Sequence, residues 1–263
     1  RELLVGLPGH DTMTGWFGAY NNRQQDKTQW LQMIDSTTQL LWQPIMATLV
    51  TALTDLNLSQ ATLIPSGLLS VLPLHAAWTE DTSCPSGRRY ACDHIHFSYI
   101  PSATALRTAR EIAINTPVTN ILAIDDPQPV LADSLPNSQL EVTNATSTFP
   151  NQNTILSGKN ALRTSVLAAI SSHSVLHFSC HGHVNFNSPL NSGLLLANNE
   201  TLTLRDFFNT QFSNVRLAIL SACNTSLPGS KLPDEALSLP TGLLQAGVPG
   251  IVASLWSVAD LST

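Results

Sequence analysis

Apolar side chains near the start of the chain recur at steps of three or four positions, as they do on one face of a helix. The stripe runs from Trp30 through Leu41 to Leu53. Pro44 interrupts it, and because proline lacks an amide hydrogen it must kink this helix or begin a second one. Residues 1–26 are rich in glycine and asparagine and predict a loose arm.

Short apolar runs further along predict strands. Residues 61–64 form one run, a Pro-Ser-Gly turn follows, and residues 68–72 predict the returning strand of a hairpin. Residues 79–93 are mostly polar and predict an exposed loop. Residues 94–100 alternate as a strand does, and Ser102 is placed to cap the helix that follows.

The pattern changes after Pro117, where apolar strands alternate with helices. The predicted strands are 120–124, 154–156, 175–178, 216–220 and 251–255, and the predicted helices are 141–149, 160–170 and 237–246. This alternation is typical of an α/β fold with a mainly parallel sheet flanked by helices, here preceded by a helical and hairpin N-terminal half. We therefore expect two parts, residues 1–115 and residues 116–263.

Composition excludes some classes of function. The chain has 263 residues, of which 43% are hydrophobic and 11% charged, with a formal net charge of −6. The acidic balance excludes a broad electrostatic binder of nucleic acid. Residues 236–259 carry no charge, but Pro240, Gly247 and Pro249 interrupt them. This stretch therefore predicts a helix, a turn and a buried strand, and no membrane span.

The four cysteines match neither a zinc knuckle nor a dense disulfide framework; they are Cys84, Cys92, Cys180 and Cys223. The sequence shows no secretory leader, and together these features predict a reducing, cytoplasmic location. We expect no cofactor and no metal ion.

Two reactive residue types directly follow two of the predicted strands. His181 and Gly182 come after strand 175–178, and Cys223 comes after strand 216–220. Carboxyl ends of neighbouring parallel strands meet at one edge of a sheet, so the imidazole and the thiol are expected to face each other there. An imidazole can take the thiol proton and stabilise the thiolate. The amides of Gly182 and Cys223 are candidate donors to an oxyanion.

Several motifs surround these residues in a fixed order. They are His-Phe-Ser-Cys-His-Gly at 177–182, Leu-Ser-Ala-Cys-Asn-Thr at 220–225, and the stretch 234–260, which ends in Leu-Trp-Ser-Val-Ala-Asp. Shorter matches lie at 41–44, 64–76 and 99–103. This ordered set resembles the CHAT domain, a caspase-like peptidase domain related to separase and often joined to tetratricopeptide repeats. The resemblance covers roughly residues 40 to 263.

The resemblance implies a caspase–haemoglobinase fold and cysteine endopeptidase activity on protein substrates. It implies that His181 is the general base, that Cys223 is the nucleophile, and that the amides of Gly182 and Cys223 form the oxyanion hole. Residues 1–115 would then be a supporting, pseudo-protease-like half. Family members are activated by a sensing partner such as tetratricopeptide repeats, and some cleave gasdermin-like proteins. The family domain continues beyond the Trp-Ser-Val-Ala-Asp segment, so we expect the catalytic half to be truncated at its C-terminus.

The same resemblance suggests how a substrate is chosen. Asp260 occupies the place of an acidic residue that lines the pocket for a basic P1 side chain. Ser221, two residues before the nucleophile, is neutral where some caspase relatives have an acidic residue. Trp256 and its neighbours are expected to pair with an extended substrate, main chain to main chain. These features lean toward lysine or arginine at P1.

Two other interpretations stay open beside the active peptidase. A catalytically silent scaffold with this fold would act only by protein–protein binding. A latent zymogen would need a partner to remodel residues 226–236, a loop rich in glycine and proline that follows Cys223 closely.

Other site types fit the residues less well. Zinc ligation by Cys180, His181, His183 and Cys223 is disfavoured because side chains of adjacent strand residues diverge. A serine hydrolase is disfavoured because no Gly-x-Ser-x-Gly motif occurs. The pair Asp125-Asp126 is better explained as a polar strand terminus than as a magnesium site.

Overall fold

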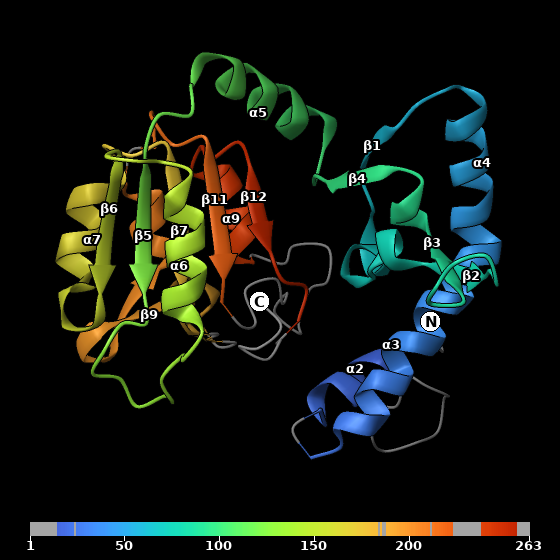
Figure 1. The fold of residues 1–263 in the computed structure, drawn as a ribbon, viewed down its shortest axis with the longest axis horizontal. Helices are drawn as coiled ribbons and strands as arrows, with labels where there is room; N and C mark the ends of the chain where they lie inside the picture. The colour runs from blue at the N-terminus through green and yellow to red at the C-terminus, as the bar shows by residue number, and fades with distance from the viewer. Residues whose placement is uncertain are drawn as a thin grey trace. The chain divides into compact units, whose positions relative to one another are not determined.

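The computed structural model describes residues 15–256 apart from residues 24, 184, 186–187, 211 and 223–237. The chain divides between Ile100 and Pro101 into two compact units, each with its own helices and strands (Figure 1). Helix α5, Ala103–Asn115, therefore goes with the second unit, whereas the sequence-based division leaves it with the first part. The supporting role of residues 1–115 stays a prediction.

The long apolar stripe of the first unit forms two helices joined without a break. Helix α3 spans Lys27–Leu41, and helix α4 spans Ala47–Asp55. Between them lies a π-helical segment, Trp42–Met46, in which the amide of Ala47 reaches back to the carbonyl of Trp42. Pro44 lies in this segment, and because it donates no hydrogen bond the wider π-turn carries the chain past it. Pro44 was predicted to kink this helix or to begin a second one; it lies in a π-helical segment, and the second helix, α4, begins three residues later at Ala47.

The N-terminal arm contains a helix that the sequence did not predict. Helix α2 spans Gly15–Asn21 and buries Trp16 and Tyr20. Their rings meet that of Trp30 on α3 edge to face, with centroids 4.8 Å and 5.4 Å away. Aromatic pairs of this geometry add to the area that they bury. The expectation of a loose arm is therefore wrong for residues 15–21.

The strands of the first unit pair differently from the predicted hairpin. Strand β1, Gln60–Leu63, runs parallel to strand β4, His96–Tyr99. The predicted returning strand is instead a 3-10 helix, Gly67–Val71. The unit's antiparallel hairpin is formed by β2, Trp78–Glu80, and β3, Arg88–Tyr90, where a loop was predicted.

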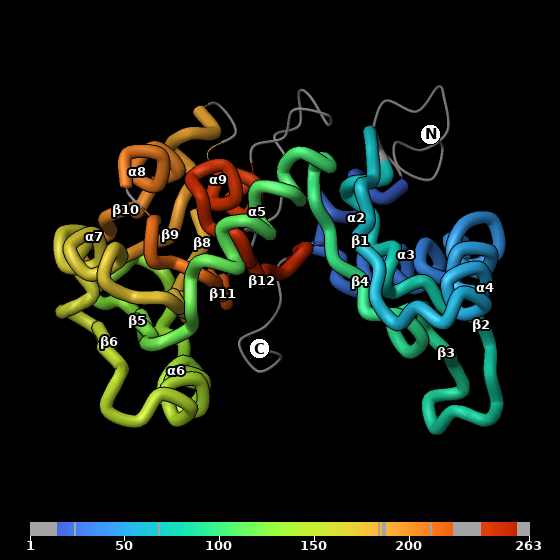
Figure 2. Tube along the Cα trace, turned by 90° about the horizontal axis from the view of Figure 1, so that it is seen from above, coloured from blue at the N-terminus to red at the C-terminus, as the bar shows by residue number. Residues whose placement is uncertain are grey.

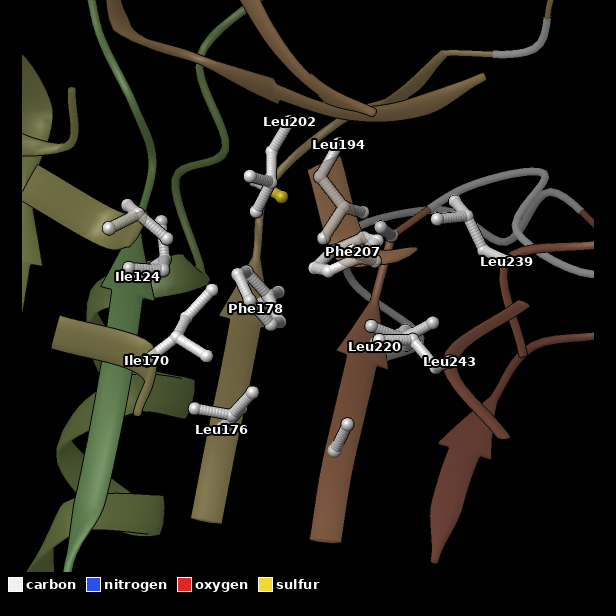
Figure 3. Close-up of a cluster of buried hydrophobic side chains, with 14 of the residues drawn as sticks. Ile124, Ile170, Leu176, Phe178, Leu194, Leu202, Phe207, Leu220, Leu239 and Leu243 are labelled. Atoms are coloured by element: carbon white, nitrogen blue, oxygen red, sulfur yellow. The ribbon is translucent and has the colours of Figure 1, made fainter. Parts of the chain in front are cut away.

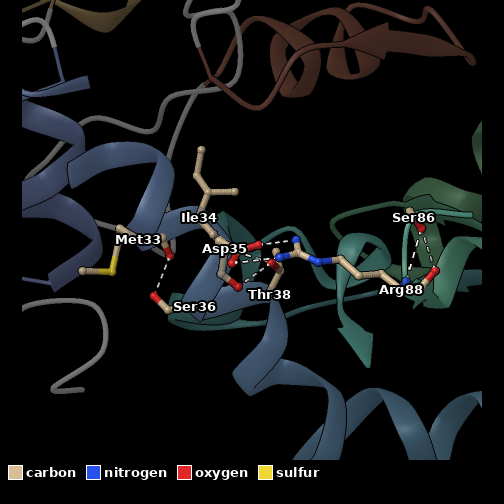
Figure 4. Close-up of polar contacts among 7 residues, drawn as sticks. All are labelled: Met33, Ile34, Asp35, Ser36, Thr38, Ser86 and Arg88. Carbon is tan, nitrogen blue, oxygen red and sulfur yellow. Dashed lines mark hydrogen bonds and ion pairs between the residues drawn. The ribbon is translucent and has the colours of Figure 1, made fainter. Parts of the chain in front are cut away.

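Arg88 connects this hairpin to helix α3. Its guanidinium pairs with both carboxylate oxygens of Asp35, as Figure 4 shows, and lies 3.8 Å from the ring centroid of Trp78. One cation therefore makes a bidentate ion pair and a cation–π contact. This explains how a hairpin of such short strands is held in place.

The second unit is built on a five-stranded sheet in the order β12-β11-β7-β5-β6, with all neighbours parallel. The strands are β5 (Ile121–Asp125), β6 (Asn153–Ser157), β7 (Val175–Ser179), β11 (Leu217–Ser221) and β12 (Ile251–Ala253). The helices around it are α6 (Ser138–Ser147), α7 (Arg163–Ile170), α8 (Leu204–Phe208) and α9 (Leu239–Gln245). The predicted α/β fold with a mainly parallel sheet flanked by helices is confirmed.

Helices cover both faces of this sheet. Figure 2 shows α6 on one side and α7, α8 and α9 on the other. The apolar core lies on the side of α7, α8 and α9, where Phe178 and Leu220 meet Ile170, Phe207 and Leu243 (Figure 3). Strand β7 is buried along its whole length, because it lies between β5 and β11 and is covered on both faces. It is therefore the central strand of the unit.

A smaller antiparallel sheet adjoins this core. It has the order β10-β9-β8, from β8 (Gly182–His183), β9 (Gly193–Leu196) and β10 (Glu200–Thr203). Leu194, Leu196 and Leu202 from it are fully buried. Along the described ranges no helix has both the length and the apolar character that crossing a membrane requires.

We predict that Gly193→Ala destabilises the second unit by about 1–3 kcal/mol, because an added Cβ would lie 2.0 Å from the carbonyl oxygen of Leu202 and push β10 away. Gly158→Ala is the matched control: its φ of +51° costs about 1 kcal/mol, but nothing lies within 4 Å of the new Cβ. Urea unfolding measures both. Equal losses of stability would contradict this explanation of Gly193.

Candidate active site

His181 lies two residues after the end of the central strand β7, at the carboxyl edge of the sheet. Its Nε2 lies 2.7 Å from the carbonyl oxygen of Asp133. A carbonyl only accepts hydrogen bonds, so we assign the proton to Nε2. Nδ1 is then the nitrogen with a free electron pair, which is what a general base requires.

The carbonyl that orients His181 belongs to the loop between β5 and α6. Two hydrogen bonds tie this loop to the turn between β9 and β10. The amide of Leu131 donates to Asn199 Oδ1 at 2.7 Å, and the amide of Asn198 donates to the carbonyl of Pro129 at 2.9 Å. Asn199 has a φ of +57°, a conformation that asparagine tolerates better than most residues. These two hydrogen bonds therefore hold the loop at the residues on either side of Val130.

Gly182 begins strand β8 immediately after the histidine. The amide of Leu195 on β9 donates to the carbonyl of His181 at 2.8 Å, and Gly182 is the next residue in the same register. Because hydrogen-bonded and non-hydrogen-bonded pairs alternate in an antiparallel ladder, the amide of Gly182 is turned away from β9. This orientation suits a donor to a substrate oxyanion.

Four strands end in a single row of polar residues, which we call the polar row: Ser157, Asp125, Ser179 and Ser221. These four are direct register partners on β6, β5, β7 and β11. Ser157 donates to Asp125 at 2.9 Å, and Ser138 on α6 donates to the other carboxylate oxygen of Asp125 at 2.7 Å. These bonds explain Asp125 as a strand terminus and require no metal ion.

Glu141 on α6 accepts hydrogen bonds from two members of the polar row. Its Oε2 accepts hydrogen bonds from Ser179 at 2.8 Å and from Ser221 at 3.0 Å. Its Oε1 lies 3.1 Å from Nε2 of His177, although neither ring nitrogen of that buried histidine has an aligned hydrogen bond among the described residues. Partial burial raises the pKa of Glu141, but the contacts with His177, Ser179 and Ser221 outweigh it, so the pKa lies below its ordinary value.

The end of β12 is tied to the residue before Cys223. Ser254 Oγ donates to the carbonyl of Ala222 at 3.3 Å. Trp256, two residues further on, is partly buried. The strand that leads to the predicted nucleophile is therefore held by Glu141 at Ser221 and by Ser254 at Ala222.

The structure places some predicted site residues and leaves others out. His181, Gly182, Ser221 and Trp256 are in the described part of the chain. Cys223, Asp260 and the predicted gate at 226–236 lie outside it, so their roles stay predictions. The register of Ser179 with Ser221 makes the ends of β7 and β11 neighbours, as the sequence analysis expected of the strands that precede His181 and Cys223.

The structure also describes Cys180 and His183, the two residues that flank His181 and Gly182. Cys180 is buried in the apolar core, and His183 is exposed. Among the residues that the structure describes, no group of three or more His, Cys, Asp or Glu side chains is placed to hold a metal ion.

Sequence reasoning missed two groups of this site, Asp133 and Glu141. Asp133 contributes its carbonyl, which every residue has, so no residue type indicates it. Glu141 lies in a segment predicted to be helical, where a lone glutamate looks like a surface residue. Only the register of the strands shows what it contacts.

The second unit is an α/β unit with a parallel sheet, and its carboxyl edge carries a histidine beside the strand that leads toward Cys223. The chain belongs to the CHAT domain family, whose model matches residues 35–263. The predicted resemblance is thereby confirmed.

Two solved structures are similar to the chain at low sequence identity. One is the Arg-specific cysteine proteinase gingipain R, with 12% identity, a TM-score of 0.43, and coverage of 62% of this chain and 40% of that one. The other is a complex of the Porphyromonas gingivalis RgpB pro- and mature domains, with 10% identity, a TM-score of 0.49, and coverage of 89% and 56%. The chain therefore spans about half the length of these proteins. No curated protein matches it.

We predict that Asn199→Gly loosens the loop that orients His181. Glycine accepts the positive φ but offers no acceptor to Leu131, so the hydrogen bond at the loop is lost. The Nε2 proton of His181, followed by NMR, should exchange with water severalfold faster. Asn199→Asp, which keeps an acceptor oxygen, is the control and should resemble the wild type. Unchanged exchange in the glycine variant would contradict the role of this hydrogen bond.

We also predict that the stability contributed by Glu141 is lost in acid. Because its folded pKa lies below the ordinary value of 4.5, the contribution is fully present above that pH and disappears as the pH falls through the lower folded pKa. The difference in urea midpoint between wild type and Glu141→Gln should therefore shrink between neutral pH and about pH 3. Glu111→Gln, an exposed glutamate on α5, should show little difference at either pH. A constant difference for Glu141 would contradict the prediction.

Proposed function

We propose that this protein is a cysteine endopeptidase that cleaves protein substrates through a dyad of His181 and Cys223. The observation that carries the proposal is the orientation of His181. Its Nε2 is held by a backbone carbonyl, and it stands at the end of the strand beside the one that leads to Cys223. A base oriented by a third group next to a nucleophile is the arrangement that thiol catalysis requires.

In the proposed reaction, Nδ1 of His181 takes the proton of the Cys223 thiol, and the sulfur attacks the scissile carbonyl carbon. The resulting oxyanion is bound by the amides of Gly182 and Cys223. His181 then gives its proton to the leaving amine, the peptide bond breaks, and an acyl-enzyme thioester remains. A water molecule loses a proton to His181 and attacks the thioester, the carbon–sulfur bond breaks to release the second product, and His181 returns its proton to the sulfur.

Substrate recognition is proposed to involve Asp260, Trp256 and Ser221. Asp260 would attract a lysine or arginine side chain at P1, in line with the family motif. Trp256 follows β12, whose end is tied to Ala222, so main-chain pairing with a substrate would take place close to the nucleophile. Ser221 already donates to Glu141, and its part in binding a substrate would be secondary.

Activation is proposed to depend on a partner, as in other members of the family. A sensing protein, such as one with tetratricopeptide repeats, would remodel residues 226–236 and release a latent enzyme in the cytoplasm. A gasdermin-like protein is one candidate substrate.

We predict that Cys223→Ala and His181→Ala each abolish cleavage of a peptide library with lysine or arginine at P1. Cys92→Ala and His183→Ala are the matched controls, because they remove an exposed thiol and an exposed imidazole. Both controls should cleave as the wild type does. Circular dichroism checks that each variant is folded.

Two results would contradict the proposal. Full activity in either dyad variant would exclude the mechanism. A wild-type chain that cleaves nothing, and whose Cys223 is not labelled by a P1-arginine chloromethyl ketone, would favour the silent scaffold.

A further inference from the structure

We propose that Glu141 is a positioning residue that fixes the spacing between the strand ends leading to His181 and Cys223. This inference rests on the proposed function and adds to it a residue outside the dyad. Ser179 stands two positions before His181, and Ser221 stands two positions before Cys223. Any group that joins these serines therefore holds together the two strands that lead to the dyad.

The joining group is a single oxygen atom. Oε2 of Glu141 accepts hydrogen bonds from both serine hydroxyls, at 2.8 Å and 3.0 Å, although the serines belong to different strands. In the described residues the register of β7 with β11 ends at this pair, and one more backbone hydrogen bond follows, from the amide of Cys180 to the carbonyl of Ser221 at 3.3 Å. The bridge made by Glu141 lies beside this last backbone bond, so the two together hold the strand ends at a fixed separation. A displacement of about 1 Å between catalytic groups can cost about a hundredfold in rate.

Helix α6 has other contacts that hold it on the sheet, so its docking does not require Glu141. Ser138, at the start of the same helix, is completely buried and donates to Asp125. Val142, one residue after Glu141, is buried, and α6 packs against β5 and β7. The helix therefore has its own polar and apolar anchors, and loss of Glu141 should affect the strand ends more than it affects helix docking.

The carboxylate is engaged on both of its oxygens. Oε1 contacts His177, Oε2 is shared by the serines, and the side chain is 19% exposed. Ser179 is 2% exposed, so its hydroxyl cannot turn to water if the acceptor is removed. The lowered pKa of Glu141 keeps it ionised near neutral pH, where a charged acceptor makes the stronger hydrogen bonds.

The test follows the reactivity of Cys223 with iodoacetamide from pH 5 to pH 9. A thiol paired with an imidazolium reacts well below the ordinary thiol pKa of about 8.5. Trypsin releases residues 217–231, which contain Cys223 alone, and residues 90–107, which contain Cys92 as an internal reference. Mass spectrometry then gives both alkylation rates in one sample, without a substrate or a partner.

We expect Glu141→Ala to slow alkylation of Cys223 near pH 6 by about tenfold, because the dyad loses its spacing. Glu141→Gln should recover most of the rate, since its amide oxygen can still accept from both serines. Glu111→Ala, which removes an exposed glutamate of the same unit, should match the wild type. If Glu141→Ala does not fold, Ser179→Ala replaces it, because this variant removes only the bond from β7, and it should slow alkylation severalfold.

The outcomes separate this inference from the proposed function. Wild-type reactivity at low pH that is lost in His181→Ala, but unchanged in every folded variant of Glu141 and Ser179, would overturn the positioning role and leave the dyad intact. If Cys223 is alkylated as slowly in Glu141→Gln as in Glu141→Ala, the charge of Glu141 and not its hydrogen-bonded bridge supports the reactivity. This result would also overturn the positioning role. If Cys223 of the wild type reacts only as Cys92 does and His181→Ala changes nothing, the proposed function itself fails.

Discussion

The second unit depends on the way in which polar side chains are satisfied at the carboxyl edge of its sheet. Four neighbouring strands place Ser157, Asp125, Ser179 and Ser221 side by side. Buried or half-buried hydroxyls at such an edge need acceptors, and two carboxylates provide them, one within the row and one from helix α6. Each acceptor joins groups that are far apart in sequence, so this edge is cross-linked by side chains as well as by the backbone.

The same row explains why the sequence predicted the positions of β7 and β11 well but placed their C-terminal ends one residue too early. Strand 175–178 was predicted from its apolar run, whereas the structure continues it to Ser179, and strand 216–220 likewise continues to Ser221. A hydrophobic pattern stops where polar residues begin, although the backbone pairing goes on. The position of His181 and Gly182 after a central strand was therefore predictable from the sequence, while their catalytic roles stay predictions. The acceptors that support them were not predictable.

Errors in the first unit have a different physical origin. The apolar run at 68–72 has the composition of a strand, but the chain there forms a 3-10 helix, and β1 takes a parallel partner from a distant segment, His96–Tyr99. Short segments carry little preference of their own, and tertiary pairing decides their state. The helix at Gly15–Asn21 was missed because its stability comes from burying two aromatic rings against α3, which no local pattern reveals.

The imidazole of His181 is oriented by a main-chain oxygen, that of Asp133, and this affects how the protein can evolve. Every amino acid supplies that oxygen, so replacements at position 133 leave the orienting group in place and can accumulate by neutral drift. Insertions, deletions or new prolines in the same loop would move the oxygen itself. Natural selection at this place is therefore expected to act on the length and path of the loop, and hardly at all on the identity of the residue.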